Sequence, residues 1–317
     1  MSSSRPSNWT TDVASSRSDT FRSLRNRNAR LFFGGLLVSN VGTWLQSTAM
    51  SILVYRLTGK ATDLGITVAL QFLPMLLLGA WAGALSDRHD KRRTSLITQS
   101  AMAAQAILLG ALDLAGLVNV PVVYGLALVL GVANAFDNPS RRGLVVELVP
   151  EADISNAMSL NTAVMTGSRI FGPALAAALV GPLGTGWCFM LNGLSFAAVL
   201  ASLAMLNVSE LRISPKAPAG GTPVRDALRF VRRDRELLTL HLVLVVVSTF
   251  AFNYSVSLPK LSAVRWGDER WFGWVLAVVS VGSVTGSLLV ASRKSASIRG
   301  FYARDRKSTR LNSSHTV

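Results

Sequence analysis

The sequence predicts an all-α protein that crosses a membrane several times. Half of its 317 residues are hydrophobic (50%), the mean hydropathy is +0.39, and only 15% are charged. A soluble domain usually carries about a quarter charged residues. Apolar segments of roughly 20 residues recur along the chain, and each can cross about 30 Å of hydrocarbon as a helix. Helices are expected because lipid offers no water to satisfy an exposed backbone.

The first element is a tail, residues 1–27, which is rich in Ser and Arg. No secretory core of roughly 7–15 apolar residues precedes Leu31, so we interpret the tail as disordered and cytoplasmic. Eight apolar segments follow, and the fourth is short. They are residues 31–55, 64–85, 96–116, 121–137, 156–180, 186–206, 238–258 and 272–291.

The distribution of Lys and Arg predicts the orientation of these spans. The tail and the loops after spans two, four, six and eight hold 23 of them up to Arg304, whereas the loops on the opposite side hold five. Positive charge is retained on the cytoplasmic side of a membrane. We therefore expect a multi-pass protein of a bacterial inner (plasma) membrane with its N-terminus in the cytoplasm.

The longest internal loop, residues 208–236, indicates a domain boundary. Pro and Gly interrupt its first half, and its second half places four apolar residues on one helical face among arginines. A basic amphipathic helix of this kind is typical of a segment that lies on the inner leaflet. We expect a six-helix bundle at residues 28–207 and an incomplete second bundle at residues 237–304.

The sequence offers little support for enzyme chemistry. Cys188 is its one cysteine, and its three histidines are scattered. It contains neither a phosphate-binding Gly-rich loop nor a nucleophile elbow. We predict no catalytic residue, no metal site and no cofactor. The net charge of +15 would favour nucleic acid in a soluble chain, but the basic residues lie in alternate loops, so no nucleic-acid partner is expected.

The turn between the second and third spans carries the most specific motif. Residues 83–93 read Gly-Ala-Leu-Ser-Asp-Arg-His-Asp-Lys-Arg-Arg. This stretch resembles the signature Gly-x-x-x-Asp-Arg/Lys-x-Gly-Arg/Lys-Arg/Lys of the major facilitator superfamily. The residues that match are Gly83, Asp87, Arg88, Lys91 and Arg92. Asp90 stands where the family usually has glycine, so the turn can differ locally.

Two further stretches resemble the siderophore- and drug-exporter branch of that family, similar to the enterobactin exporter. Residues 40–65 contain Asn-Val-Gly-Thr-Trp and Tyr-Arg-Leu-Thr-Gly. Residues 135–173 contain Ala-Phe-Asp-Asn-Pro-Ser-Arg-Arg and Arg-Ile-Phe-Gly-Pro. Gly172 and Pro173 are similar to the family's antiporter motif without its flanking glycines, and we expect a helix bend there.

The resemblance implies twelve spans in two six-helix bundles, related by an axis along the membrane normal. The eight spans expected here would then be one bundle and the first two helices of the next. Residues 305–317 look like a translated sequencing adapter, so we expect a truncated gene model, with a genuine polar tail as the alternative.

For activity, the resemblance implies export of a small amphipathic molecule, a siderophore or a drug, across the lipid bilayer. Alternating access in a monomer, coupled to protons, is the implied mechanism. An importer on the same fold is one alternative. A membrane scaffold or receptor that transports nothing is another.

The resemblance also implies a conformational switch on the cytoplasmic side. Asp137, at the foot of the fourth predicted span, is expected within reach of Lys91 or Arg92. Asp87 is expected to steady the outward-open state by contacting the second bundle, and loss of these contacts would accompany rocking to the inward-open state. Alternatively, the basic residues only anchor the topology and anionic lipid.

Residues that could contact a substrate in a central cavity lie inside the predicted spans. Arg169 is near the middle of the fifth span, where a charge costs at least ~2.5–3.5 kcal/mol and needs water or a partner. A polar stripe at i, i+3, i+4, i+7 on the first span consists of Asn40, Thr43, Trp44 and Ser47. The remaining candidates are Asn134, Asn161 and Asn253. The alternative for all of them is structural packing or hydrogen bonding between helices.

The residue that would couple transport to protons is not located by sequence. A proton antiporter usually needs a carboxylate whose pKa is raised by burial. No acidic residue falls in the middle of a predicted span: Asp63 and Asp113 lie at outer ends, and Asp87 and Asp137 at inner ends.

Overall fold

The computed structural model describes residues 21–212, 229, 231–251, 254–267, 271–272, 274–275, 278–279 and 281–282. The chain divides into two compact units, Met1–Ala277 and Val278–Val317, and the described residues of the second unit are helical. Residues 1–20 and 305–317 lie outside the described residues, as does most of the predicted amphipathic segment.

The described part of the chain is helical and contains no strand. Short 3-10 helices are η1 (Arg22–Arg25), η2 (Glu151–Asp153) and η3 (Val208–Glu210). The α-helices are α1 (Arg27–Thr58), α2 (Ala61–Ser86), α3 (Lys91–Leu114), α4 (Val120–Glu147), α5 (Ile154–Ala204), α7 (Arg235–Ala251) and α8 (Tyr254–Trp266).

Side-chain caps define where several helices begin. The Asn26 side chain accepts hydrogen bonds from the first backbone amides of α1, and Asn119 does the same for α4. Asp90 caps α3 by accepting from the Arg93 amide at 3.0 Å. Asp and Asn are favoured at this position because their oxygens satisfy amides that have no partner in the first turn. The departure from glycine at Asp90 therefore has a structural use.

Helix α5 is two membrane-length helices joined by a kink. At 51 residues it would be about 77 Å long if straight, more than twice the hydrocarbon thickness. Gly184 interrupts it with φ 81° and ψ 172°, a conformation that L side chains rarely adopt. We call residues 154–183 the first leg of α5 and residues 185–204 its second leg. They correspond to the predicted fifth and sixth spans.

The predicted end of the fourth span at residue 137 is wrong. Helix α4 continues through Pro139 to Glu147. Pro139 removes one backbone donor, but the side chains around it fold back on the helix: Asn138 donates to the Asn134 carbonyl at 2.9 Å and Ser140 donates to the Phe136 carbonyl at 3.0 Å. Asp137 therefore lies inside α4, about 15 Å of helix rise before its end.

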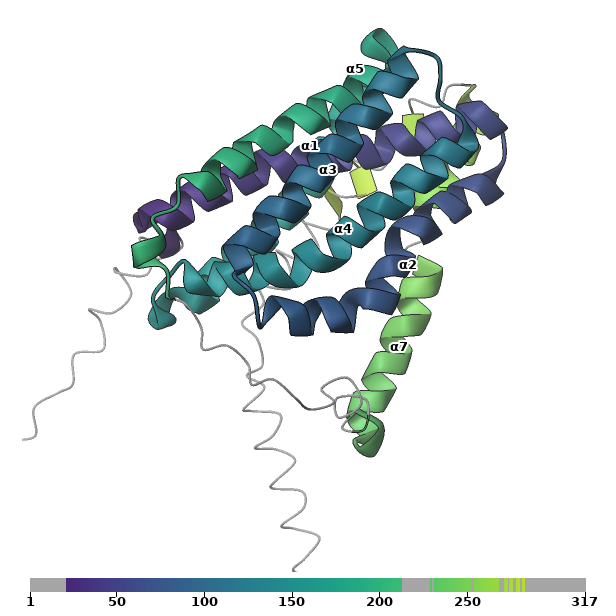
Figure 1. Cartoon of the computed structure of the whole chain (residues 1–317). Coiled ribbons are helices and arrows are strands. Elements are labelled where there is room, and N and C mark those ends of the chain that lie inside the picture. The colour runs from purple at the N-terminus through teal and green to yellow at the C-terminus, as the bar shows by residue number, and fades with distance from the viewer. Residues whose placement is uncertain are drawn as a thin grey trace, which may run out of the picture. The chain divides into compact units, whose positions relative to one another are not determined.

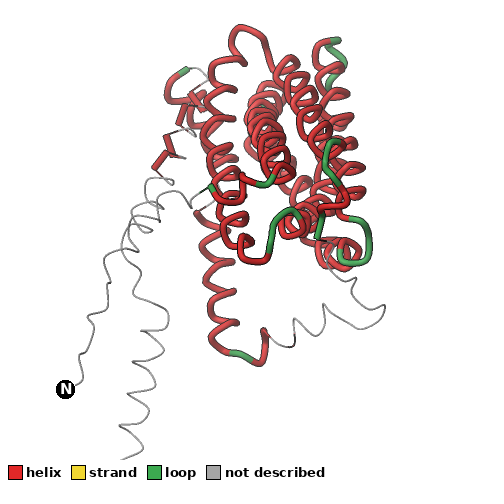
Figure 2. Tube along the Cα trace, turned by 90° about the vertical axis from the view of Figure 1, so that its left-hand side faces the viewer, coloured by secondary structure: helices red, strands yellow, loops and turns green. Residues whose placement is uncertain are grey.

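Helices α1 to α5 lie side by side as a bundle (Figures 1 and 2). α1 packs along α5, α2 along α4, and α3 against both α4 and α5. One core cluster contains Phe32 and Phe196, and a second contains Ile52 and Phe189. Gly42 lets α1 approach the second leg of α5 closely, because a Cβ there would collide with side chains of that leg.

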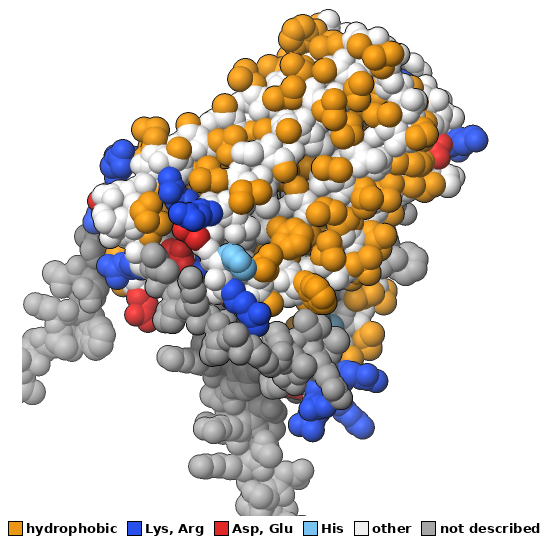
Figure 3. Space-filling model, viewed as in Figure 1, with side chains coloured by type: hydrophobic (Ala, Val, Ile, Leu, Met, Phe, Trp, Pro, Cys, Tyr) orange, Lys and Arg blue, Asp and Glu red, His pale blue; other side chains and the backbone are white. Residues whose placement is uncertain are grey.

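Within the part of the chain that the structure describes, four segments are long and apolar enough to cross a membrane: α2, α3, α4 and the region of α5. Helix α1 has 32 residues, but the polar residues of its middle lower its mean hydropathy. Large apolar side chains face outward, as on α2, where Leu76 and Trp81 are 79% and 76% exposed. Hydrophobic atoms cover the middle of the face in Figure 3, and most charged atoms lie toward its ends. These features confirm the all-α polytopic fold class.

Candidate functional site

The α2–α3 turn holds the sequence motif at the surface. The Asp87 backbone amide donates to the Gly83 carbonyl at 3.0 Å and so closes the end of α2. The side chains of Asp87 and Arg88 are exposed, and among the residues that the structure describes neither has a side-chain partner. These two charged groups are therefore available for contacts with other parts of the protein or with lipid.

The basic residues at the start of α3 tie it to two other helices. Lys91 pairs with Glu147 of α4 at 2.5 Å, and these side chains are only 11% and 6% exposed. Arg92 donates to the Leu203 and Ala204 carbonyls at 2.6 and 3.1 Å. Those carbonyls belong to the last turn of α5, where a cation also complements the helix dipole.

The expected contact of Asp137 with Lys91 or Arg92 is wrong in this structure. Both basic residues have other partners, and the longer α4 carries Asp137 away from the α2–α3 turn. Glu147 takes the place that sequence reasoning gave to Asp137. It was missed because the fourth span was ended before it.

Asp137 is instead a buried carboxylate between α4 and α3. It is 1% exposed and accepts hydrogen bonds from Thr98 at 2.9 Å and Gln99 at 3.0 Å. The Arg141 Nε lies 3.6 Å from its second oxygen. A charge at this depth is tolerated because donors and a cation surround it.

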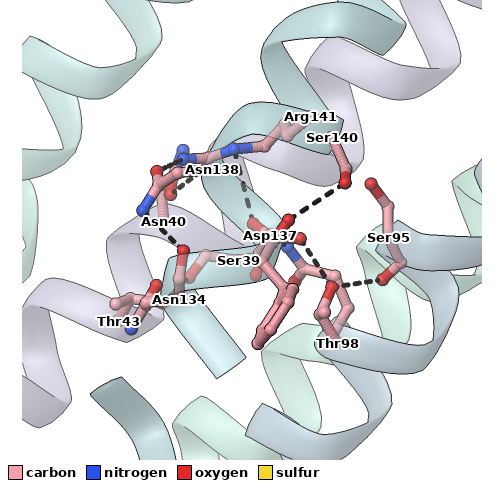
Figure 4. Close-up of polar contacts among 12 residues, drawn as sticks. Ser39, Asn40, Thr43, Ser95, Thr98, Asn134, Asp137, Asn138, Ser140 and Arg141 are labelled. Carbon is pink, nitrogen blue, oxygen red and sulfur yellow. Dashed lines mark hydrogen bonds and ion pairs between the residues drawn. The ribbon is translucent and has the colours of Figure 1, made fainter. Parts of the chain in front are cut away.

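Arg141 joins α4 to α1. Its Nη1 donates to the Asn40 Oδ1 at 3.2 Å and its Nη2 to the Asn138 Oδ1 at 3.0 Å (Figure 4). Its side chain is 11% exposed. On the other side, the Asn40 amide donates to the Met165 sulfur on α5 at 3.3 Å. Sequence reasoning missed Arg141 and Asn138. The i, i+4 spacing of Asp137 and Arg141 could have indicated an ion pair, because residues at this spacing are neighbours on a helix. That indication required α4 to extend past Asp137.

Arg169 and Trp44 come together one turn along from this contact. The Arg169 guanidinium lies over the Trp44 ring, 5.1 Å from its centroid, a cation–π geometry. Gly172 permits this approach, because a Cβ at that position would collide with the Trp44 Cβ and come within 2.9 Å of the Leu45 amide nitrogen. Pro173 is buried beside it within helical backbone, and α5 leaves helical geometry at Gly184.

We call Asn40, Trp44, Asp137, Asn138, Arg141, Met165 and Arg169 the α1–α4–α5 polar cluster. The other candidates contribute less to it. Thr43 donates to the Ser39 carbonyl and Asn134 to the Leu130 carbonyl, each within its own helix. Ser47 and Asn161 are half-buried, and Asn253 lies outside the described residues.

A second set of buried amides joins α1, α3 and the second leg of α5. Gln46 donates to Gln105 at 3.0 Å and accepts from Asn192 at 2.7 Å, and Ser195 donates to Asn192 at 3.1 Å. Hydrogen bonds of this kind hold helices together in lipid. We therefore assign these side chains a structural role in holding the helices of the bundle together.

Asp63 and Asp113 each accept a hydrogen bond from a hydroxyl group of another helix. Tyr124 donates to Asp63 at 2.8 Å, and Thr185 donates to Asp113 at 2.5 Å. Within the described residues, no three His, Cys, Asp or Glu side chains lie together as metal ligands would.

Comparison with known families gives one match over most of the chain. The family described as transmembrane secretion effector matches residues 18–299. The major facilitator transporter YfiS of Bacillus subtilis, whose function is uncharacterised, is 25% identical over 81% of this chain and 62% of its own length. The staphyloferrin A transporter of Staphylococcus aureus is 23% identical over 82% of this chain and 66% of its own length.

Other relatives extend the same pattern. The multidrug efflux pump Tap of Mycolicibacterium fortuitum is 28% identical over 80% of this chain and 64% of its own length. Among solved structures, a bacterial homologue of the human lysosomal transporter Spinster, inward-facing and unoccupied, superposes with a TM-score of 0.63 at 14% identity. That match covers 84% of this chain and 64% of the other. The chain thus spans about two thirds of the length of these proteins.

Proposed function

This chain belongs to the transmembrane secretion effector family of major facilitator transporters, and we propose that it moves a small amphipathic molecule across a bacterial inner membrane by alternating access. It is a multi-pass membrane protein, and its relatives are transporters and not enzymes. In our proposal it works as a monomer with its N-terminus in the cytoplasm, in agreement with the distribution of Lys and Arg.

The α1–α4–α5 polar cluster is the observation that carries this proposal. It places two guanidinium groups and a carboxylate on membrane-length helices, with Asp137 and Arg141 largely buried and Arg169 exposed beside Trp44. A charge at the centre of a membrane helix costs about 2.5–3.5 kcal/mol on insertion scales. A membrane scaffold does not need charges there, whereas a transporter needs polar groups that can bind its cargo. The residues assigned to cargo are Asn40, Thr43, Trp44, Ser47, Asn134, Asn161, Arg169 and Asn253.

The direction and the cargo of transport are a finer proposal. Relatives named as a staphyloferrin A transporter and a multidrug efflux pump favour export of a siderophore or a drug. Export driven by the proton gradient needs a carboxylate that can bind and release a proton. Import on the same fold is the second candidate.

We also assign a conformational switch to the α2–α3 turn. The proposed switch residues are Gly83, Asp87, Arg88, Lys91 and Arg92, and Asp137 is no longer among them because it contacts Thr98 and Gln99 instead. Lys91 and Arg92 hold α3 to α4 and α5, while Asp87 is exposed beside them. A two-state contact between Asp87 and the second half of the transporter would bias the rocking equilibrium through charge.

Everted membrane vesicles test this function directly. Cells lacking their own exporters supply vesicles with and without the protein, and a pH-sensitive dye reports proton release from the lumen when a candidate substrate is added. We expect substrate-dependent alkalinisation of the lumen and uptake of the substrate. Uptake without proton movement would overturn the coupling. Uptake only in right-side-out vesicles would reverse the proposed direction.

A further inference from the structure

We propose that Arg141 and Arg169 form a binding site for an organic carboxylate, and that Asp137 acts as the internal counter-ion with which this anion competes. The proposal deepens the transport function above by naming the chemical class of its cargo. It rests on how the two guanidinium groups are held in the structure.

Arg141 is paired less tightly than a buried arginine can be. A carboxylate and a guanidinium usually form two parallel hydrogen bonds at about 2.7–2.9 Å. Here the Asp137 oxygen is 3.6 Å from Nε, beyond hydrogen-bond length. Asp137 turns toward α3, where Thr98 and Gln99 donate to its two oxygens. The fork of Arg141 thus lacks its strongest kind of partner.

Neutral amide oxygens occupy that fork. The Asn40 and Asn138 side chains accept from its two terminal nitrogens at 3.2 and 3.0 Å (Figure 4). Hydrogen bonds between two charged groups are about twice as strong as those with a neutral partner. A carboxylate that displaced the two amides would therefore gain interaction energy. Asn40 already donates to the Met165 sulfur, so its side chain can turn away and keep a contact.

Trp44 and Arg169 supply the rest of the site. Asn40 and Trp44 are one helical turn apart on the same face of α1, a spacing that places Cβ atoms about 5–6 Å from each other. Arg169 lies over the Trp44 ring, which offers a planar apolar surface beside a second positive charge. The cluster contains two guanidinium groups and one carboxylate, which lies against Arg141, so the groups offered to a ligand suit an anion better than a cation. The ligand that fits has a carboxylate and an aromatic or similarly planar group.

Three probes of the same shape test the charge preference: 3-phenylpropionate, its neutral amide 3-phenylpropanamide, and the cation 3-phenylpropylamine. Binding to the purified chain in phosphatidylcholine nanodiscs is measured by titration calorimetry. We expect the anion to bind at least ~10-fold more tightly than either other probe, in line with charge-assisted recognition. Equal or tighter binding of the cation would overturn the proposal.

Variants with opposite expected signs separate binding from structure. Arg141→Gln should abolish binding of the anion, and Arg169→Gln should weaken it. Asp137→Asn should tighten it about fivefold or more, because it removes the competing charge. If the ion pair were only structural, Asp137→Asn would weaken binding as Arg141→Gln does, and this outcome would overturn the proposal. Arg142→Gln, an exposed neighbour that loses the same charge, is the control and should bind as the unchanged protein does.

The folding of each variant is checked before its binding, and binding is tested separately from transport. Each variant is first examined by size-exclusion chromatography. If Arg141→Gln does not fold, Arg141→Lys keeps the charge without the fork and should bind the anion more weakly than the unchanged protein. Unaltered binding would refute the role of Arg141. Binding is measured without transport. If the protein binds the anion but no uptake occurs in vesicles, only the proposed transport function is refuted. If the protein exports a cationic substrate but binds none of the three probes, only the inferred carboxylate site is refuted.

Discussion

At the scale of single residues, the described bundle places its charges in two different environments. Lys91 and Glu147 meet directly at 2.5 Å near the end of α4, and both are largely buried. Asp137 and Arg141 lie deeper along the same helix at 3.6 Å and share their hydrogen-bonding capacity with neutral side chains. The first pair is suited to holding helices together. The second pair has the looser geometry that suits the ligand exchange proposed above.

The Lys91–Glu147 pair should contribute to stability. Glu147→Gln leaves a buried ammonium without its carboxylate, and breaking such a pair costs about 3–5 kcal/mol. We expect a clear loss of unfolding free energy in a denaturant titration in detergent. Arg93→Gln is the control, since the Arg93–Asp90 pair is 83% and 53% exposed and 4.0 Å apart. It should change stability by no more than about 0.5–1 kcal/mol. Equal effects from the two variants would contradict this assignment.

At the scale of helices, close packing of α1 against α5 positions the polar cluster. Glycines at the contact let the backbones approach, and Gly172 brings the first leg of α5 against Trp44. Arg169 lies one turn before Gly172 on the same helix, so the close approach also sets the guanidinium above the indole ring. The kink at Gly184 then redirects the chain into the second leg.

Gly172→Ala should disturb both stability and the cation–π contact. The added Cβ would collide with the Trp44 side chain and the α1 backbone, and such overpacking typically costs about 1–3 kcal/mol. Gly167→Ala is the matched control on the same helix, because nothing lies within 4 Å of its Cβ. It should be neutral or stabilising by up to about 1 kcal/mol through helix propensity. Thermal unfolding of the two variants checks the difference, and equal melting temperatures would refute the packing role of Gly172.

At the scale of the whole molecule, the described bundle corresponds to one half of a transporter that we propose alternates between two conformations. The exposed apolar side chains of α2 and the charges at the α2–α3 turn are available to the membrane and to other parts of the transporter. A rocking mechanism needs charge contacts that form in one state and break in the other.

Asp87→Asn tests whether the α2–α3 turn takes part in such a switch. We expect normal membrane insertion, because Lys91 and Arg92 keep their contacts with α4 and α5. Transport in everted vesicles should fall to the background level. Glu151→Gln removes the same charge from the exposed α4–α5 connection and should transport normally. Unchanged transport by Asp87→Asn would remove the switch role.

Much of the fold could be predicted from local patterns in the sequence. Apolar segment length predicted membrane helices and their all-α class, because a helix is the simplest way to satisfy backbone groups in lipid. The two predicted spans at 156–180 and 186–206 match the two legs of α5. The end of α4 could not be predicted from the sequence, because a charged residue followed closely by Pro139 resembles a helix end. The helix continues through Pro139, and the carboxylate of Asp137 then meets donors on α3.

The sequence alone determined the family motif, the helical class and the presence of Trp44 and Arg169 as unusual residues within apolar segments. Only the tertiary structure decided which charges meet. Arg141 looked like part of a cytoplasmic loop, and Glu147 had no assigned role. The physical reason is that a buried charge chooses its partner by distance and donor geometry across helices, and sequence spacing reports neither. Only the packing of α1, α3, α4 and α5 showed that Lys91 pairs with Glu147. It also showed that Arg141 donates to two amides and lies 3.6 Å from a carboxylate.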